Sequence, residues 1–308
     1  MKGLLLCAAT LFLLTGCVSK NYDYLSADKS IAQSKKLQLT IYPQEAYFCG
    51  PASLATLLTQ QNVEFVYGDV IGTTFTPELM GSLQVEMKAT ARRYGLIPYT
   101  LNPGLAPVLS EVSNNTPVLV LFNLGLTPLP AWHYAVVTGF DKAEKKVFLS
   151  APKGDQTWMS FDDFEMFSQR GGSWAIVALK PPLLPIASNE VEMIRSITDM
   201  YNVGYKEQAK LAAINYVSIY PTSSLGSIML ANMYMDIRDY LNATIEYKRA
   251  VALKPHDPVL LNNLAQSLLK ENKLREAKQY ALEAIDIGGI FLVEYQNTLE
   301  EIKRKLQE

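Results

Sequence analysis

The chain has 308 residues, which at about 150 residues per domain predicts two domains. Hydrophobic residues make up 49% and charged residues 19%, a balance that excludes a disordered chain and a membrane protein with many spans. The net charge is −2 and no stretch is strongly basic, so we expect no nucleic-acid partner. Three cysteines and two histidines leave little for a metal site, and we expect neither metal nor cofactor.

The first residues predict export from the cytoplasm. Lys2 precedes an apolar run that is too short to span a bilayer of ~30 Å as a permanent helix. The run closes with Leu14-Thr15-Gly16-Cys17, which resembles the lipobox of bacterial lipoproteins. The resemblance implies a signal peptide over 1–16 and a lipid on Cys17. An ordinary signal peptide is the alternative. Because Val18 is not the aspartate of an inner-membrane retention signal, we expect an anchor in the outer membrane of a Gram-negative bacterium, facing the periplasm.

The remaining chain divides at a proline-rich stretch. Residues 17–38 are polar and predict a tether, and 39–182 mixes helical and strand patterns, which indicates an α+β domain. Pro181-Pro182 and Pro185 break the periodicity and mark the boundary. The expected elements are a strand at 37–42, helices after Cys49 and around 79–94 and 105–112, and strands at 117–122, 133–140, 145–150 and 174–179.

Residues 188–308 are helical and repeat with a period of 34. With Pro255 as the last position of one unit, the packing positions of a tetratricopeptide (TPR) repeat fall on Leu230, Ala231, Tyr234, Ala243, Tyr247 and Ala250. The next unit has Leu264, Ala265, Leu268, Ala277, Ala281 and Ala284, and the preceding, degenerate unit keeps Ala209, Ala213 and Pro221. We therefore expect an all-α solenoid of about three repeats with a groove for a protein partner.

Cys49 is the only cysteine left once the signal peptide and the lipidated residue are set aside. Cys49-Gly50-Pro51 opens an apolar helical pattern, which places the thiol at the positive end of a helix, where its pKa should fall. Gln44, five residues earlier, could supply an oxyanion donor. The alternative is a buried core cysteine.

A base for such a nucleophile is found in only one place. His133 begins a predicted strand, whereas His256 lies in a polar turn between repeats. A hydrogen-bonded core histidine is the alternative for His133, but the pair of Cys49 and His133 favours catalysis.

These residues resemble the bacteriocin-processing, double-glycine-leader peptidase family and its stand-alone papain-fold relatives. The resemblance covers 39–182 and rests on Gln44, Cys49-Gly50-Pro51, the strand from His133 to Phe140 and the segment 161–174. It implies a papain-like cysteine peptidase fold, with Gln44 as oxyanion donor, Cys49 as nucleophile and His133 as base. A cell-wall amidase of the NlpC type would usually add a second histidine.

The fourth residue of that family's site departs from the pattern. The family has an Asp-Pro pair where this chain has Ala151-Pro152. From the expected hairpin register, Ser150 lies on the same face as His133 and could orient the imidazole, and Asp155 could loop back to it. A hydroxyl lacks the full negative charge with which a carboxylate stabilises an imidazolium. The sequence is therefore also compatible with a slow or inactive enzyme.

Three functions follow from these patterns. The first is a membrane-anchored cysteine peptidase that cleaves a peptide bond, such as that of a leader peptide, with the repeats recruiting substrate or partner. The second is an inactive, peptidase-like adaptor that binds polypeptides in an envelope assembly. The third is acyl or amide transfer at the same site. No phosphate-binding loop of a transporter ATPase is present, so coupling to export would not be intrinsic.

Overall fold

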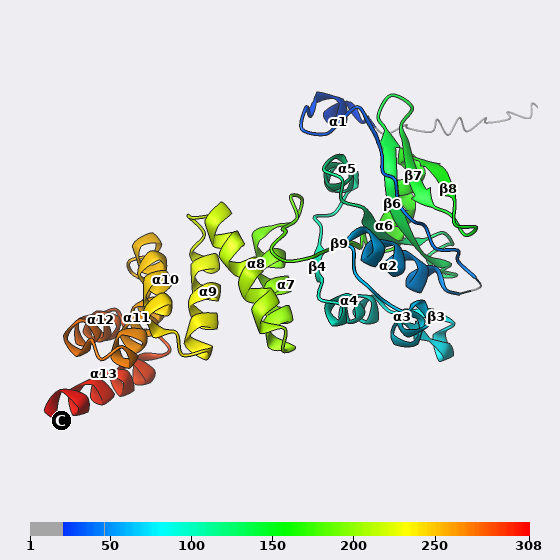
Figure 1. Ribbon diagram of the computed structural model, residues 1–308. Helices are drawn as coiled ribbons and strands as arrows, with labels where there is room; N and C mark the ends of the chain where they lie inside the picture. Colours follow the sequence, from blue (N-terminus) through cyan, green and yellow to red (C-terminus); the bar gives the residue numbers. More distant parts are fainter. Residues whose placement is uncertain (1–20, 46) are drawn as a thin grey trace, which may run out of the picture.

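The structure is a computed structural model that describes residues 21–45 and 47–308. An α+β domain is followed by a row of helices, as the ribbon in Figure 1 shows. The sheet has seven strands in the order β4-β9-β5-β6-β7-β8, with β1 also paired to β6, and all pairs are antiparallel. Its strands are β1 (Ser34–Lys36), β4 (Ile97–Thr100), β5 (Val118–Asn123), β6 (Trp132–Asp141), β7 (Lys146–Ser150), β8 (Gln156–Ser160) and β9 (Ala175–Leu179).

The sheet is covered on both faces because β5 is apolar at nearly every position and most of β6 is buried. Along β5, Leu119 and Leu121 pack with one group of helices, whereas Val118, Val120 and Phe122 pack with another. The first group is α2 (Cys49–Gln60), α3 (Tyr67–Thr74) and α4 (Gln84–Arg93), and the second is α5 (Leu105–Ser113) and α6 (Phe161–Arg170). The α+β class predicted from the sequence is confirmed, including the strands at β5, β6, β7 and β9.

The expected strand at 37–42 and part of the expected tether are corrected by the structure. The strand is β1, at Ser34–Lys36, and it is preceded by the short helix α1 (Asp23–Ala27). Buried Lys142 holds this segment, because its amine donates to the carbonyls of Leu25 at 2.7 Å and Ile31 at 2.9 Å. Residues 23–36 are therefore part of the folded domain. The lipidation site Cys17 lies outside the described residues.

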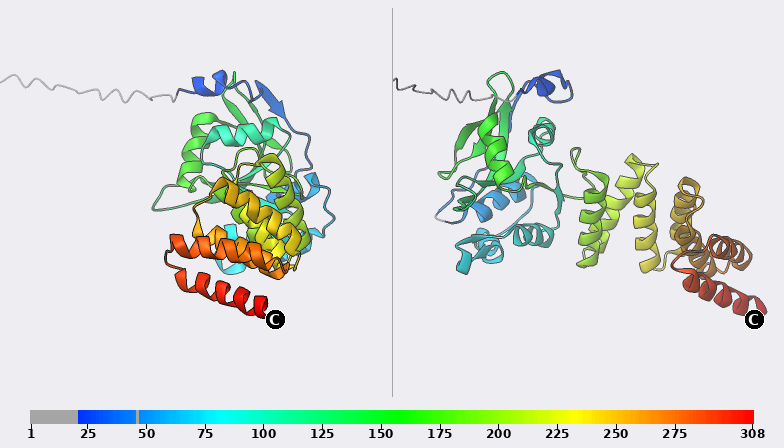
Figure 2. Two further views of the ribbon diagram at one scale, coloured as in Figure 1. Left: turned by 90° about the vertical axis from the view of Figure 1, so that its left-hand side faces the viewer. Right: turned by 180° about the vertical axis from the view of Figure 1, so that it is seen from behind.

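The C-terminal helices form three antiparallel pairs followed by one further helix. The pairs are α7 (Glu190–Asn202) with α8 (Lys206–Ile219), α9 (Ser224–Asp236) with α10 (Tyr240–Leu253), and α11 (Pro258–Lys270) with α12 (Leu274–Ile287), and α13 (Leu292–Gln307) packs on the last pair. The predicted small packing positions are buried, since Ala231, Ala243 and Ala265 are all 0% exposed. His256 is exposed between α10 and α11, as expected. The TPR-type architecture is confirmed, and the two views of Figure 2 show the pairs stacked side by side. Within 21–45 and 47–308, no helix is both long and apolar enough to cross a membrane.

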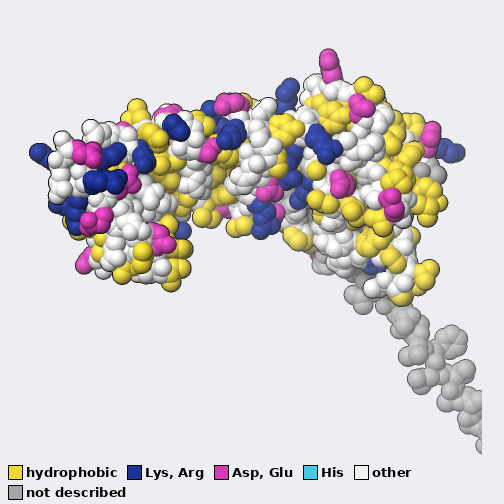
Figure 3. Space-filling view, turned by 90° about the horizontal axis from the view of Figure 1, so that it is seen from below, with side chains coloured by type: hydrophobic (Ala, Val, Ile, Leu, Met, Phe, Trp, Pro, Cys, Tyr) yellow, Lys and Arg dark blue, Asp and Glu magenta, His cyan; other side chains and the backbone are white. Residues whose placement is uncertain are grey.

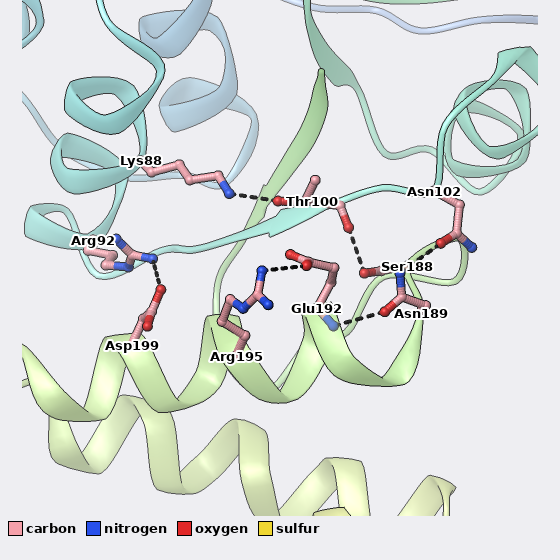
Figure 4. A network of polar contacts seen from close by, with 9 residues as sticks. All are labelled: Lys88, Arg92, Thr100, Asn102, Ser188, Asn189, Glu192, Arg195 and Asp199. Carbon is pink, nitrogen blue, oxygen red and sulfur yellow. Dashed lines mark hydrogen bonds and ion pairs between the residues drawn. The ribbon is translucent and has the colours of Figure 1, made fainter. Parts of the chain in front are cut away.

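The two parts of the chain share an interface with ordered polar contacts. Arg92 of α4 pairs with Asp199 of α7 at 2.9 Å, and the Ser188 hydroxyl donates to the Thr100 carbonyl at 2.6 Å. Asn189 caps the start of α7 and also donates to the side chain of Asn102. Figure 4 shows that these contacts run along α7. Beneath them, one apolar cluster continues from the sheet into α7, α8 and α9. The proline-rich boundary is therefore packed rather than free.

Glu111 fixes the connecting segment. It is 1% exposed, and its carboxylate accepts from the backbone N–H groups of Ile186 at 2.7 Å and Ala187 at 2.9 Å. Burial raises the pKa of the Glu111 carboxyl, and the two N–H donors act in the opposite direction.

Glu111→Ala should lower the free energy of unfolding by about 3 kcal/mol, because two N–H groups lose their acceptor. Glu111→Gln keeps a carbonyl acceptor and removes a buried charge, so its loss should stay below about 1 kcal/mol. Urea unfolding of both variants measures this difference. Equal losses in the two variants would show that the N–H contacts contribute little.

Candidate functional site

Cys49 is the first residue of α2. Pro51 lies in the first turn, where a missing N–H costs no helical hydrogen bond, and Leu54, Leu57 and Leu58 anchor the helix on the sheet. Phe48, the residue before the helix, provides no side-chain cap. The thiol is half-buried and free, at the uncapped end of the helix.

Gly50 is required by a strand that crosses the start of α2. A Cβ at Gly50 would stand 2.5 Å from the Ser82 Oγ and 2.7 Å from its Cβ. Ser82 belongs to β3 (Gly81–Ser82), which pairs with β2 (Phe75–Thr76). The Gly that follows the nucleophile candidate is therefore explained by close approach of this hairpin.

His133 is the second residue of β6, opposite Phe122 of β5. It lines the same cleft as Cys49, as the sequence predicted. Between these two described side chains the structure records no hydrogen bond. Burial lowers the pKa of the His133 imidazole, so the ring is neutral near pH 7.

Gln44 enters the cleft from the loop before α2. Its backbone N–H donates to the Pro152 carbonyl at 2.7 Å, which ties this loop to the β7–β8 turn. Both polar atoms of its side-chain amide are buried and have no hydrogen-bond partner. Because buried amides are normally bonded, this amide has unused hydrogen-bonding capacity beside the cleft.

The cleft has a volume of about 850 Å³ and mostly apolar walls. Its apolar lining residues include Leu79, Met80 and Leu83 around β3, Leu121 of β5 and Trp132 of β6. Figure 3 views the chain from below and shows hydrophobic side chains over much of the N-terminal domain. Among the described residues, no cluster of three or more His, Cys, Asp or Glu side chains could hold a metal ion.

Ser150 does not reach His133. Strands β6 and β7 pair with Val137 opposite Leu149, next to a β-bulge that shifts the register by one residue. Ser150 therefore lies opposite Val136, and its hydroxyl accepts from the Val136 N–H at 2.9 Å. It is not one of the described residues that line the cleft. The prediction that Ser150 orients the imidazole is wrong, because one bulge moves the side chain to the other face of the sheet.

Ala151 follows directly after β7. Continuing the register puts it opposite Ala135, two residues along β6 from His133 and on the same face of the sheet, and Ala151 is 7% exposed. Asp155 lies exposed in the β7–β8 turn, where its backbone carbonyl accepts from the Ala151 N–H. Across the described part of the chain, no carboxylate hydrogen-bonds to the imidazole of His133.

Burial favours the uncharged forms of both the thiol and the imidazole. Burial raises the pKa of the Cys49 thiol, although the backbone N–H groups of Gly50 and Tyr134 act in the opposite direction. The expected lowering by the helix N-terminus is therefore wrong, since desolvation of the thiolate outweighs it.

Two residues close to the thiol, Tyr134 and Ser82, were not among those predicted from the sequence. The Tyr134 N–H acts on the Cys49 sulfur, and the Tyr134 hydroxyl donates to the Ser82 carbonyl at 3.2 Å. The adjacency of Tyr134 to His133 could have indicated the first group. Nothing in the local pattern around Ser82 indicates that it meets α2.

Ala151→Asp should place a carboxylate beside the imidazole and raise the pKa of His133 by about one to three. The pKa of Cys49 should fall, because an imidazolium then favours the thiolate. NMR titration of the imidazole and alkylation of the thiol measure the two values. Ser150→Ala is the control. It should lower the free energy of unfolding by about 1 kcal/mol and leave the pKa values of His133 and Cys49 unchanged. An unchanged imidazole in Ala151→Asp would contradict the register argument.

Iodoacetamide alkylation of the protein lacking residues 1–17 tests the charge state of the thiol. Because the pKa of the Cys49 thiol is raised, the alkylation rate should rise only at a pH above ~8.5, the pKa of a free thiol. His133→Ala should not move the midpoint, since a neutral imidazole provides no charge. A midpoint well below ~8.5 that rises in His133→Ala would instead demonstrate an ion pair.

Comparison with known proteins agrees with this fold. Residues 36–178 match the model of the Peptidase_C39 like family. A double glycine motif protease from an AMS/PCAT transporter, solved with the leader peptide, is 19% identical over 47% of this chain and 93% of that chain, with a TM-score of 0.36.

Two further solved structures resemble part of the chain. The first TPR of Spaghetti (RPAP3) bound to an HSP90 peptide is 17% identical over 38% of this chain and 93% of that one, with a TM-score of 0.35. The Yersinia enterocolitica type III secretion chaperone SycD, in complex with a peptide of the translocator YopD, is 19% identical over 38% and 98%, with a TM-score of 0.35. No curated protein matches the chain. Residues 36–178, which include Cys49 at the start of α2 and His133 on β6, are thus similar to the Peptidase_C39 like family, and a region of paired helices follows them.

Proposed function

We propose that this protein is a cysteine peptidase in which Cys49 is the nucleophile, His133 the base and Gln44 the oxyanion donor. The observation that carries the proposal is the buried Gln44 amide without a partner, in the same cleft as the other two side chains. An unbonded buried amide is costly for stability, and a substrate oxyanion would supply the missing acceptor.

The neutral resting pair defines how the chemistry begins. The sulfur of Cys49 attacks the peptide carbonyl carbon while the His133 imidazole takes the thiol proton, so that charge forms only in the transition state. The oxyanion accepts from Gln44 and from backbone N–H at the start of α2. The C–N bond then breaks, the imidazolium protonates the leaving amine, and a thioester remains. Water, deprotonated by His133, hydrolyses the thioester and the thiol is restored.

The repeats are proposed to recruit a polypeptide. Val191, Leu225 and Val259 each occupy the second position of α7, α9 and α11, spaced by 34 residues, and they are 54%, 40% and 38% exposed. Exposed apolar side chains at equivalent positions of stacked repeats offer a row of contacts to an extended chain.

A membrane anchor at Cys17 completes the proposal. It rests on Leu14-Thr15-Gly16-Cys17 alone and places the enzyme in a bacterial envelope, at the outer membrane and facing the periplasm. Labelling with radioactive palmitate, compared between the wild type and Cys17→Ala, tests this point.

An inactive adaptor is the second candidate function, and one observation favours it. Ala151, two residues from His133 in register and on the same face of the sheet, carries no carboxylate to stabilise an imidazolium, and burial raises the pKa of the Cys49 thiol. In that function the cleft and the repeats bind a polypeptide without cleaving it.

Incubation with a library of natural peptides, followed by mass spectrometry of new termini, separates the two functions. The wild type should produce new termini, and Cys49→Ala and His133→Ala should abolish them. Gln44→Ala should lower kcat by about 10²- to 10³-fold, the usual cost of one oxyanion donor. His256→Ala, an exposed histidine of the repeats, is the control and should match the wild type. Retention of peptides without cleavage by the wild type would favour the adaptor.

A further inference from the structure

A second buried polar group lines the cleft without a partner. The Ser82 hydroxyl has no hydrogen-bond partner and is shielded from solvent, like the Gln44 amide. The mechanism above uses Gln44 and leaves Ser82 without a role. Both groups lie within the cleft that contains Cys49.

Ser82 is held in place from two directions. Its backbone pairs with Phe75 across the β2–β3 hairpin, and its carbonyl accepts from the Tyr134 hydroxyl at 3.2 Å. The close approach of its Oγ to Gly50 shows that the side chain stands directly over the first turn of α2. The hydroxyl therefore lies against Gly50, the residue after the nucleophile candidate, and Ser82 is part of the lining of the cleft.

We propose that Ser82 is a substrate-positioning group that donates a hydrogen bond to a main-chain carbonyl of the bound peptide, next to the scissile bond. The ligand is an extended polypeptide backbone, since the cleft walls are apolar and Ser82 is a neutral donor. The proposal rests on the peptidase function for its reaction, but the binding contact itself requires only an occupied cleft. This contact would give a hydrogen-bond partner to the Ser82 hydroxyl, which is buried and unbonded in the free protein.

Two electrophiles separate this contact from thiol reactivity. Iodoacetamide reports the reactivity of Cys49 alone, and acetyl-Ala-Leu-Gly-Gly-chloromethyl ketone adds a peptide backbone on one side of the reacting carbon. Ser82→Ala should slow alkylation by the peptide reagent about five- to tenfold, the value of one neutral hydrogen bond, and leave the iodoacetamide rate unchanged. Ser53→Ala is the matched control, because its buried hydroxyl is also unpartnered but Ser53 does not line the cleft.

A binding measurement makes the test independent of catalysis. A fluorescent 15-residue peptide that ends in Ala-Leu-Gly-Gly is titrated into Cys49→Ala and into Cys49→Ala/Ser82→Ala. The double variant should bind about five- to tenfold more weakly, by fluorescence anisotropy. If the wild-type thiol reacts with neither electrophile but Ser82→Ala still weakens binding, the peptidase function fails and the Ser82 contact stands. Equal rates and equal affinities with and without the hydroxyl, or no binding of the peptide to Cys49→Ala, would overturn the proposal.

Discussion

Strand β6 pairs with three other strands, and the position of His133 depends on that pairing. The first half of β6 is hydrogen-bonded to β5 and its second half to β1. Strand β7 is hydrogen-bonded to the other edge of β6. The strand carries His133 at one end and buried Lys142 just beyond the other. A single strand thus joins the cleft, the core and the N-terminal segment, and a change in its register would move all three together.

The cleft shows how burial competes with a helix dipole. Residues at the start of a helix are often activated as anions, yet here desolvation raises the pKa of the thiol and lowers that of the imidazole. Both shifts favour the uncharged forms. Polar groups without partners, Gln44 and Ser82, stand around this neutral pair, so the site is arranged for charge that develops only when a ligand is present.

Much of this arrangement could be predicted from the sequence, because it depends on local patterns. Pro51 and the apolar spacing after Cys49 specify α2, and the alternating and continuous apolar runs specify β5 and β6. Prediction failed for Ser150, since a bulge of one residue reverses the faces of a strand and has no signature in composition.

Contacts between residues far apart in the chain could not be predicted from the sequence either. The two-residue strands β2 and β3 are too short to give a periodic signal, so Ser82 could not be placed over Gly50. The N-terminal segment is polar and was predicted as a tether, but Lys142, more than a hundred residues away, binds its carbonyls.

The packed junction between the sheet and α7 fixes the geometry of the whole chain. Glu111 holds the connecting backbone, Arg92 pairs across to Asp199, and one apolar cluster runs through both parts. The sheet, α7, α8 and α9 therefore share one packed core. If a polypeptide engaged both the cleft and the repeats, this packing would set the spacing along that polypeptide between its two bound segments.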